Sequence, residues 1–341
     1  MPTSRSNNKI IGISIGDPGG IGPEVILKSF QSEYLQRHLT AQRGANVFFV
    51  CFGSMAVLER NRVIARSTVQ LNAISDIKDP LLKPSVLNVL DISDTAEEYA
   101  VGKIAEQNAR LALKAVERAA RYAKEGLIDA LVTAPINKEA CQMIRPKFCG
   151  HTELLAEIDQ TPRFAMMLCG EMLRVVLVTT HIPLKDVAGA ISQEAIVEKI
   201  ILAHEYLKDR VKINDPRIGV AGLNPHAGEG GKIGREEEEM IIPAVAQARS
   251  KGISVAGVYP PDVIFHKAYC GELDAIIAMY HDVGLAPLKM IAFESGINVT
   301  LGLSFVRTSP DHGTAFDIAY KNKAHETSMC NAIIHALSLL K

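Results

Sequence analysis

Short apolar runs alternate with amphipathic, helix-like stretches along almost all of this 341-residue chain. The runs are rich in β-branched residues and are bounded by turn residues, which is typical of buried parallel strands. Early examples are the runs at 9–15, 46–51 and 130–133, with helices expected over 23–38 and 102–125. This alternation predicts an α/β fold with a mainly parallel sheet.

The composition gives no sign of a polyanionic or membrane partner. The length exceeds that of a typical single domain, so two domains are expected. A formal net charge of −1 gives no electrostatic case for binding nucleic acid or an anionic membrane. No apolar stretch is long enough to cross a bilayer, and the polar residues 1–9 do not resemble a signal peptide. A cytoplasmic location is therefore expected.

Three apolar runs end on or just before a histidine. Residues 173–180 lead into His181, 217–223 lead through Asn224 and Pro225 into His226, and 274–280 lead into His281. A single histidine in such a place is usually a strand cap or a packed turn residue. Ligands of open α/β sheets bind beyond the carboxyl ends of the strands, where three imidazoles could converge. Three neutral imidazoles leave a divalent ion one open position, so the sequence predicts a catalytic metal site.

Two glycine-rich segments could approach a ligand. In the turn at 16–24, Asp17 is expected to project its carboxylate into a crevice, although a plain turn is an equally good explanation. The loop at 224–231 surrounds His226 with small residues, as a flexible surface turn also would.

Two further segments are expected to begin helices. The acidic run 235–239 is expected to open a helix. Thr152, taken alone, is best explained as a helix cap.

Two basic residues flank the strand-like stretch 297–303. Lys289 and Arg307 carry the fixed positive charge that holds a phosphate or carboxylate, so a shared anion pocket is plausible.

Taken together, the motifs resemble the 4-hydroxythreonine-4-phosphate dehydrogenase family of pyridoxal phosphate biosynthesis. They run in order from Gly16 to Ala319 and include Gly-His-Thr-Glu, Asn-Pro-His-Ala-Gly-Glu-Gly-Gly, Tyr-His-Asp and Asp-His-Gly-Thr-Ala. The resemblance implies an isocitrate/isopropylmalate dehydrogenase-like fold, with two α/β/α domains and a cleft between them. We expect residues 1–130 plus 298–341 to form one domain and residues 131–297 to form the metal-binding and dimerisation domain.

The resemblance also implies the functional residues. A divalent metal would be held by His181, His226 and His281. Zinc is favoured because three nitrogen ligands suit it better than magnesium, with magnesium or cobalt able to substitute. Substrate contacts would come from His151, Thr152, Lys289, Asn298 and Arg307. The candidate catalytic residues are Asp262, Asp282 and Lys289. Asp262 and Asp282 are the candidates for the general base, and either could instead orient a ligand histidine. The enzyme would be a homodimer with a shared active site, and His281 is expected to complete the partner's site.

The implied reaction is oxidation of 4-phosphohydroxy-L-threonine by NAD, followed by decarboxylation to 3-amino-2-oxopropyl phosphate. A related branch acts on D-threonate or D-erythronate 4-phosphate. Asp17, His312, Gly313 and Asp317 would contact the cofactor. Asp317 would bind the adenosine ribose and repel a 2′-phosphate, which favours NAD over NADP, unless it merely caps a short helix.

Two departures from the family pattern stand out. Val283 replaces a usual glutamine, and Tyr320 and Asn322 replace usual glycines in the segment that resembles the adenosine-binding loop. Outside the family, the residues would also suit a metal-dependent sugar-phosphate hydrolase or aldolase, or a catalytically silent protein that binds phosphorylated metabolites.

Overall fold

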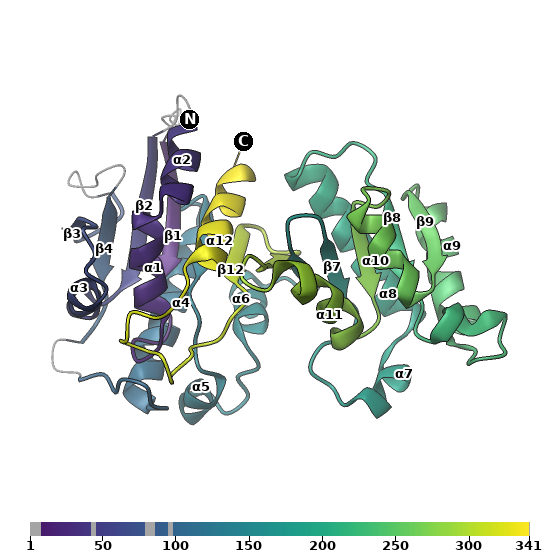
Figure 1. The fold of residues 1–341 in the computed structure, drawn as a ribbon, viewed down its shortest axis with the longest axis horizontal. Helices are drawn as coiled ribbons and strands as arrows, with labels where there is room; N and C mark the ends of the chain where they lie inside the picture. Colours follow the sequence, from purple (N-terminus) through teal and green to yellow (C-terminus); the bar gives the residue numbers. More distant parts are fainter. Residues whose placement is uncertain (1–7, 42–45, 79–85, 95–97, 341) are drawn as a thin grey trace. The chain divides into compact units, whose positions relative to one another are not determined.

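The structure is a computed structural model that describes residues 8–41, 46–78, 86–94 and 98–340. It divides into two compact units (Figure 1). Unit 1 comprises Met1–Gln160 and Leu303–Lys341, and unit 2 comprises Thr161–Gly302. Both are α/β, as predicted. The expected boundaries at 130/131 and 297/298 move to 160/161 and 302/303, because the two helices after residue 133 pack in unit 1 and residues 297–301 form a strand of unit 2.

The sheet of unit 1 is entirely parallel in its described pairings. Its strands lie in the order β3 (Leu71–Ile74), β4 (Leu87–Asp91), β2 (Asn46–Gly53), β1 (Asn8–Ser14), β5 (Ala130–Thr133) and β12 (Val306–Pro310). Ile11, Phe49 and Leu131 are fully buried on these strands. The continuous apolar runs of the sequence thus correspond to strands that are covered on both faces.

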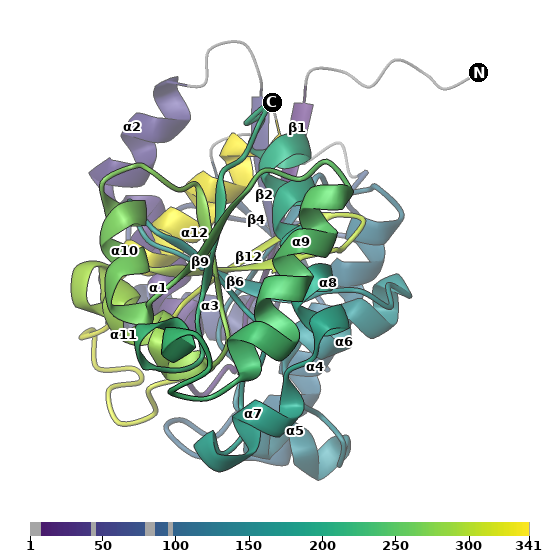
Figure 2. The same ribbon diagram turned by 90° about the vertical axis from the view of Figure 1, so that its right-hand side faces the viewer.

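Two groups of helices cover this sheet, on opposite faces (Figure 2). The helix α12 (Thr327–Ser338) packs on β5 and β12, next to α1 (Gly22–Gln31) and α2 (Glu33–Ala41). The helix α4 (Glu106–Lys124) packs on β1, β2 and β5, next to α5 (Lys138–Ile144) and α6 (His151–Asp159). A further helix, α3 (Met55–Ile64), contacts α1 and β4. The single helix expected over 23–38 is two helices, because the backbone is extended at Ser32.

The sheet of unit 2 is mixed. Its strands lie in the order β11 (Ile297–Leu301), β6 (Ala165–Cys169), β7 (Arg174–Leu177), β10 (Ala275–Ala278), β8 (Ile218–Ala221) and β9 (Val255–Tyr259). The strand β6 runs antiparallel to both of its neighbours, whereas β7, β10, β8 and β9 are parallel. The core of the unit is apolar and includes Val175, Leu177, Ile276 and Leu288.

The helices of unit 2 also lie on both faces of its sheet (Figure 2). On one face are α8 (Gln193–Glu205) and α9 (Ile242–Ser250), and on the other are α10 (Pro261–Tyr269) and α11 (His281–Ala292). Shorter helical segments connect them: η1 (Leu184–Asp186), α7 (Val187–Ala190), η2 (Tyr206–Arg210), η3 (Pro225–Glu229) and η4 (Glu237–Ile241).

The strand β4 follows β3 along the chain and pairs with it in parallel, and residues 79–85 between them lie outside the described residues. Within the described part of the chain, no helix is both long and apolar enough to cross a membrane.

Candidate active site

The three strand-end histidines follow neighbouring strands of unit 2. The central strand β10 pairs in parallel with β7 on one side and with β8 on the other. His181 comes after β7, His281 after β10 and His226 after β8. The carboxyl ends of these strands therefore share one edge of the sheet, which is the placement that the sequence predicted.

Two of the histidines lie side by side. The ring centroids of His181 and His281 are 5.7 Å apart, with an angle of 43° between the ring planes. His281 is the first residue of α11, and its Nδ1 lies 2.7 Å from Oδ1 of Asp282. An Nδ1–H that donates to this carboxylate leaves Nε2 as the lone-pair nitrogen, which is the form that binds a metal.

His226 lies on a tightly turned loop. The backbone is left-handed at His226 (φ 53°), Ala227 (φ 51°) and Glu229 (φ 44°), a region in which residues other than glycine are uncommon. Such a conformation persists only where the surrounding structure enforces it, and it is often found at functional sites.

The residue that enforces this loop is Glu237, which the sequence analysis did not single out. Its side chain is buried, and Oε1 accepts hydrogen bonds from the backbone N–H groups of Leu223 (2.8 Å) and Asn224 (2.7 Å). Its other oxygen, Oε2, accepts one from Nδ2 of Asn224 at 2.9 Å. In the sequence, Glu237 is one residue of the acidic run 235–239. Because a run of carboxylates usually lies in solvent, its position did not indicate a buried anchor.

The described residues contain no group of three His, Cys, Asp or Glu side chains placed to hold a metal ion. His226 therefore does not complete the His181–His281 pair. The pair itself suits a borderline metal such as zinc, because two imidazoles adjoin at a strand edge and a carboxylate orients one of them.

The other candidate residues of unit 2 lie on α10, α11 and β11. Asp262 is exposed in the first turn of α10, and Asp282 is exposed beside His281. Lys289 lies on α11, with its Nζ 5.8 Å from the ring centroid of Phe293. Asn298 lies on β11, where its Oδ1 is buried and accepts no hydrogen bond, so the atom is available to a ligand donor.

In unit 1, Arg307 is a buried cation. It lies on β12 with 2% of its surface exposed, and its Nε and Nη2 donate to Oγ1 of Thr133 at 3.2 and 2.6 Å. Burial lowers the pKa of the Arg307 guanidinium to about 9, which still leaves it charged at neutral pH. A buried guanidinium of this kind is suited to binding a phosphate or carboxylate.

His151 is the first residue of helix α6, and the charge of Arg307 affects its pKa. Burial, with a further contribution from the Arg307 charge, holds the pKa of His151 well below its usual value, so the ring is neutral. Its Nε2 is buried without a hydrogen-bond partner. Thr152 is the second residue of α6 and Gly150 is its cap, so the simple capping role considered for Thr152 is wrong. A cation, an unsatisfied imidazole and a helix N-terminus together favour an anionic ligand.

Asp17 does not project into a crevice. Its side chain is completely buried, and Oδ1 accepts hydrogen bonds from the Gly19 N–H (2.8 Å) and from Nδ2 of Asn108 (3.1 Å). Burial raises the pKa of Asp17 to about 6. The carboxylate therefore shapes the glycine-rich turn from within, and a direct contact between this side chain and a cofactor is not supported.

The remaining cofactor candidates lie in one loop of unit 1, residues 311–326. Nδ1 of His312 lies 3.1 Å from the Gly313 carbonyl, and the Asp317 side chain is exposed. Residues 316–320 form turns rather than a helix, so Asp317 is not a helix cap.

Known proteins of one family are similar to this chain over nearly its whole length. The model of the family described as pyridoxal phosphate biosynthetic protein PdxA matches residues 45–336. A 4-hydroxythreonine-4-phosphate dehydrogenase from Desulforapulum autotrophicum is 41% identical over 332 residues, covering 96% of this chain and 94% of the relative. A D-threonate 4-phosphate dehydrogenase from Salmonella typhimurium is 41% identical over 333 residues, covering 97% and 99%.

A solved structure has the same fold as this chain. The crystal structure of a 4-hydroxythreonine-4-phosphate dehydrogenase from Klebsiella pneumoniae has a TM-score of 0.86 and 40% identity, covering 98% of this chain and all of the other. The fold and these relatives define an oxidoreductase with the isocitrate/isopropylmalate dehydrogenase-like architecture. The chain belongs to the PdxA family.

Proposed function

We propose that the protein oxidises a 4-phosphorylated 3-hydroxy acid with NAD and then decarboxylates the 3-keto product. The preferred substrate is 4-phosphohydroxy-L-threonine, oxidised to 2-amino-3-oxo-4-phosphooxybutanoate and decarboxylated to 3-amino-2-oxopropyl phosphate. The alternatives are D-threonate and D-erythronate 4-phosphate, since relatives named for the amino acid and for threonate are equally similar to this chain. The observation that carries the proposal is the His181–His281 pair at the carboxyl edge of the sheet of unit 2.

His181, His281 and His226 would hold the divalent ion, with zinc preferred and magnesium or cobalt as substitutes. When bound, the ion would lower the pKa of the substrate hydroxyl and stabilise the negative charge that develops as carbon dioxide leaves. Asp282 would keep the His281 proton on Nδ1 and so direct Nε2 toward the ion. Asp262, exposed and accepting no described hydrogen bond, is the better candidate for the general base.

The charged and polar groups would hold the substrate's anionic groups and its amino or hydroxyl group. Arg307 and the N-terminus of α6 would supply positive potential for phosphate or carboxylate in unit 1, and Lys289 would do so in unit 2. His151 can donate or accept through Nε2, and Asn298 can accept through Oδ1, because both atoms are buried without partners. Thr152 would add a hydroxyl in the first turn of α6.

A nicotinamide dinucleotide is the expected oxidant of a dehydrogenase family, and the loop with His312, Gly313 and Asp317 is its proposed binding segment. The exposed Asp317 carboxylate supports NAD over NADP, since it would accept hydrogen bonds from ribose hydroxyls and repel a 2′-phosphate. Membership of an oxidoreductase family leaves no support for the hydrolase, aldolase or silent-binder alternatives.

We also propose a homodimer with a shared metal site, with one revision. His181 and His281 adjoin within one chain, whereas His226 does not join them. This favours His226, rather than His281, as the ligand that reaches the partner's site.

One assay tests the proposed function. NADH formation is followed with 4-phosphohydroxy-L-threonine, D-threonate 4-phosphate and D-erythronate 4-phosphate, each with and without a chelator, and then with NADP in place of NAD. Chelator-sensitive turnover of one of the three substrates is expected. No turnover of any substrate by the metal-loaded protein would contradict the proposal, and a preference for NADP would contradict the role of Asp317.

A further inference from the structure

Tyr320 adopts a backbone conformation that a tyrosine rarely adopts. Its φ is 60°, and Asn322 two residues later has a φ of 56°. In this left-handed region the Cβ of an L-residue crowds the following carbonyl, so glycine is favoured there. A bulky residue keeps such a geometry only where its surroundings enforce it.

The side chain of Tyr320 reaches from the loop 311–326 to the glycine-rich turn. Its hydroxyl donates a 2.7 Å hydrogen bond to the carbonyl oxygen of Pro18. The guanidinium carbon of Arg60 lies 5.0 Å from the centroid of its ring, a cation–π contact. Burial raises the pKa of the Tyr320 hydroxyl, so the group stays protonated and can donate at neutral pH.

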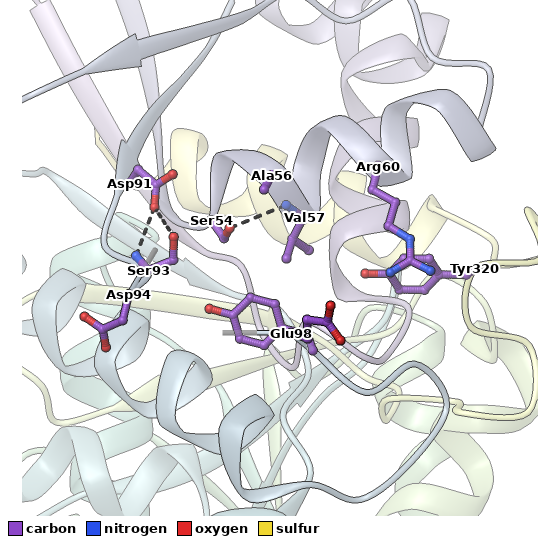
Figure 3. Close-up of a pocket in the computed structure, with 10 residues that line it drawn as sticks. Ser54, Ala56, Val57, Arg60, Asp91, Ser93, Asp94, Glu98 and Tyr320 are labelled. Atoms are coloured by element: carbon purple, nitrogen blue, oxygen red, sulfur yellow. Dashed lines mark hydrogen bonds between the residues drawn. The ribbon is translucent and has the colours of Figure 1, made fainter. Parts of the chain in front are cut away.

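Tyr320 and Arg60 also form one wall of a pocket of about 530 Å³ in unit 1. Across the pocket lie Ser54 and Asp91, at the carboxyl ends of the paired strands β2 and β4 (Figure 3). Figure 3 shows the Arg60 side chain extended along the Tyr320 ring. The tyrosine thus connects the interior of the loop with one wall of a pocket that lies where strands of a parallel sheet end.

Backbone contacts fix the same loop on either side of Tyr320. The Thr314 carbonyl accepts a hydrogen bond from the Ile21 N–H at 3.0 Å. The Ala324 N–H donates to Oε1 of Glu24 at 2.9 Å, and the Ala324 carbonyl accepts from Nζ of Lys28 at 2.8 Å. Between these two anchors the Tyr320 hydroxyl supplies a side-chain contact that a substitution can remove without altering α1.

We infer that Tyr320 is a positioning residue that fixes the loop carrying His312, Gly313 and Asp317 against the glycine-rich turn before a dinucleotide binds. The inference rests on the proposed function for its ligand. A loop held in one conformation loses less entropy on binding, so the contact acts on affinity and leaves the chemical step unchanged.

The test compares Tyr320→Phe, which removes only the hydroxyl, with Tyr320→Gly, which removes the side chain and relieves the backbone. Tyr269→Phe is the matched control, because this exposed tyrosine lies on α10 in unit 2. Hydrogen exchange of amides 313–319 is measured without cofactor, and NAD affinity is measured by calorimetry. The loss of one hydrogen bond predicts about three- to tenfold weaker NAD binding and faster exchange in Tyr320→Phe.

In steady-state kinetics, Tyr320→Phe should raise the KM for NAD by a similar factor and leave kcat within about twofold. Tyr320→Gly should show the same direction of change, and Tyr269→Phe none. Unchanged exchange and affinity in Tyr320→Phe would overturn the inference even in an active enzyme. A wild-type protein that binds no NAD would overturn the proposed function and, with it, the ligand named here, whereas the exchange data would still report on the loop contact.

Discussion

At the scale of single residues, the sequence could not give the environments of the polar groups that it singled out. Arg307, His151 and Asp17 look like ordinary surface or turn residues in the sequence, and all three are wholly or largely enclosed in the structure. Burial depends on what packs over a residue from distant parts of the chain. The pKa shifts of these groups therefore could not be predicted from the residues adjacent to them in the sequence.

The buried carboxyl of Asp17 should make stability depend on pH. Its pKa rises from 3.8 to about 6 on folding, so between these values the folded protein binds a proton that the unfolded chain has released. Stability must then fall as the pH rises from about 4 to about 6, by about 2–3 kcal/mol. Urea denaturation across this range should show the fall in wild type and a flatter profile in Asp17→Asn. Parallel profiles would contradict the assignment.

Arg307 should bind inorganic phosphate in the absence of any other ligand. Phosphate at one hundred times its Kd should raise the free energy of unfolding by about 2.7 kcal/mol, because only the folded state binds it. Thermal denaturation with increasing phosphate measures the effect. Arg307→Gln should abolish the increment, while Arg37→Gln, at an exposed ion pair on α2, should retain it. An equal increment in both variants would place the anion elsewhere.

At the scale of elements, strand ends were well predicted and loop anchors were not. The periodicity located β7, β8 and β10, and the histidines that follow them, because hydrophobic pattern is a local signal. Glu237 was missed because its partners, Leu223 and Asn224, lie in another loop. The boundaries between the units differ from the expected ones for a similar reason, since α5 and α6 pack against α4 and β11 pairs with β6.

Glu237→Gln should loosen the His226 loop. The two backbone N–H groups could still find an oxygen, but the new amide would point a donor at the donor Nδ2 of Asn224. A loss of about 1–3 kcal/mol of stability is expected, together with weaker zinc binding. Denaturation and metal titration measure the two effects. Glu238→Gln, at the exposed neighbouring carboxylate, is the control, and equal behaviour of both variants would contradict the anchoring role.

At the scale of the whole molecule, a shared metal site should show subunit complementation. If His181 and His281 act in one chain and His226 acts across the dimer, mixed dimers of His181→Ala and His226→Ala contain one intact ligand set. Activity should return in that mixture. Mixtures of His181→Ala with His281→Ala should stay inactive, because every site lacks one member of the pair. Recovery in the second mixture alone would restore His281 as the shared ligand.

The discontinuity of unit 1 has a consequence for biosynthesis. Residues 161–302 are contiguous and can fold as they leave the ribosome, whereas unit 1 lacks β12 and α12 until residues 303–341 have been translated. Until then one edge of β5 is unpaired and could pair with a wrong strand. The synthesis of β12 removes this exposed edge. Because β12 also carries Arg307, the nascent chain acquires this buried cation only after β5 and all of unit 2 have been synthesised.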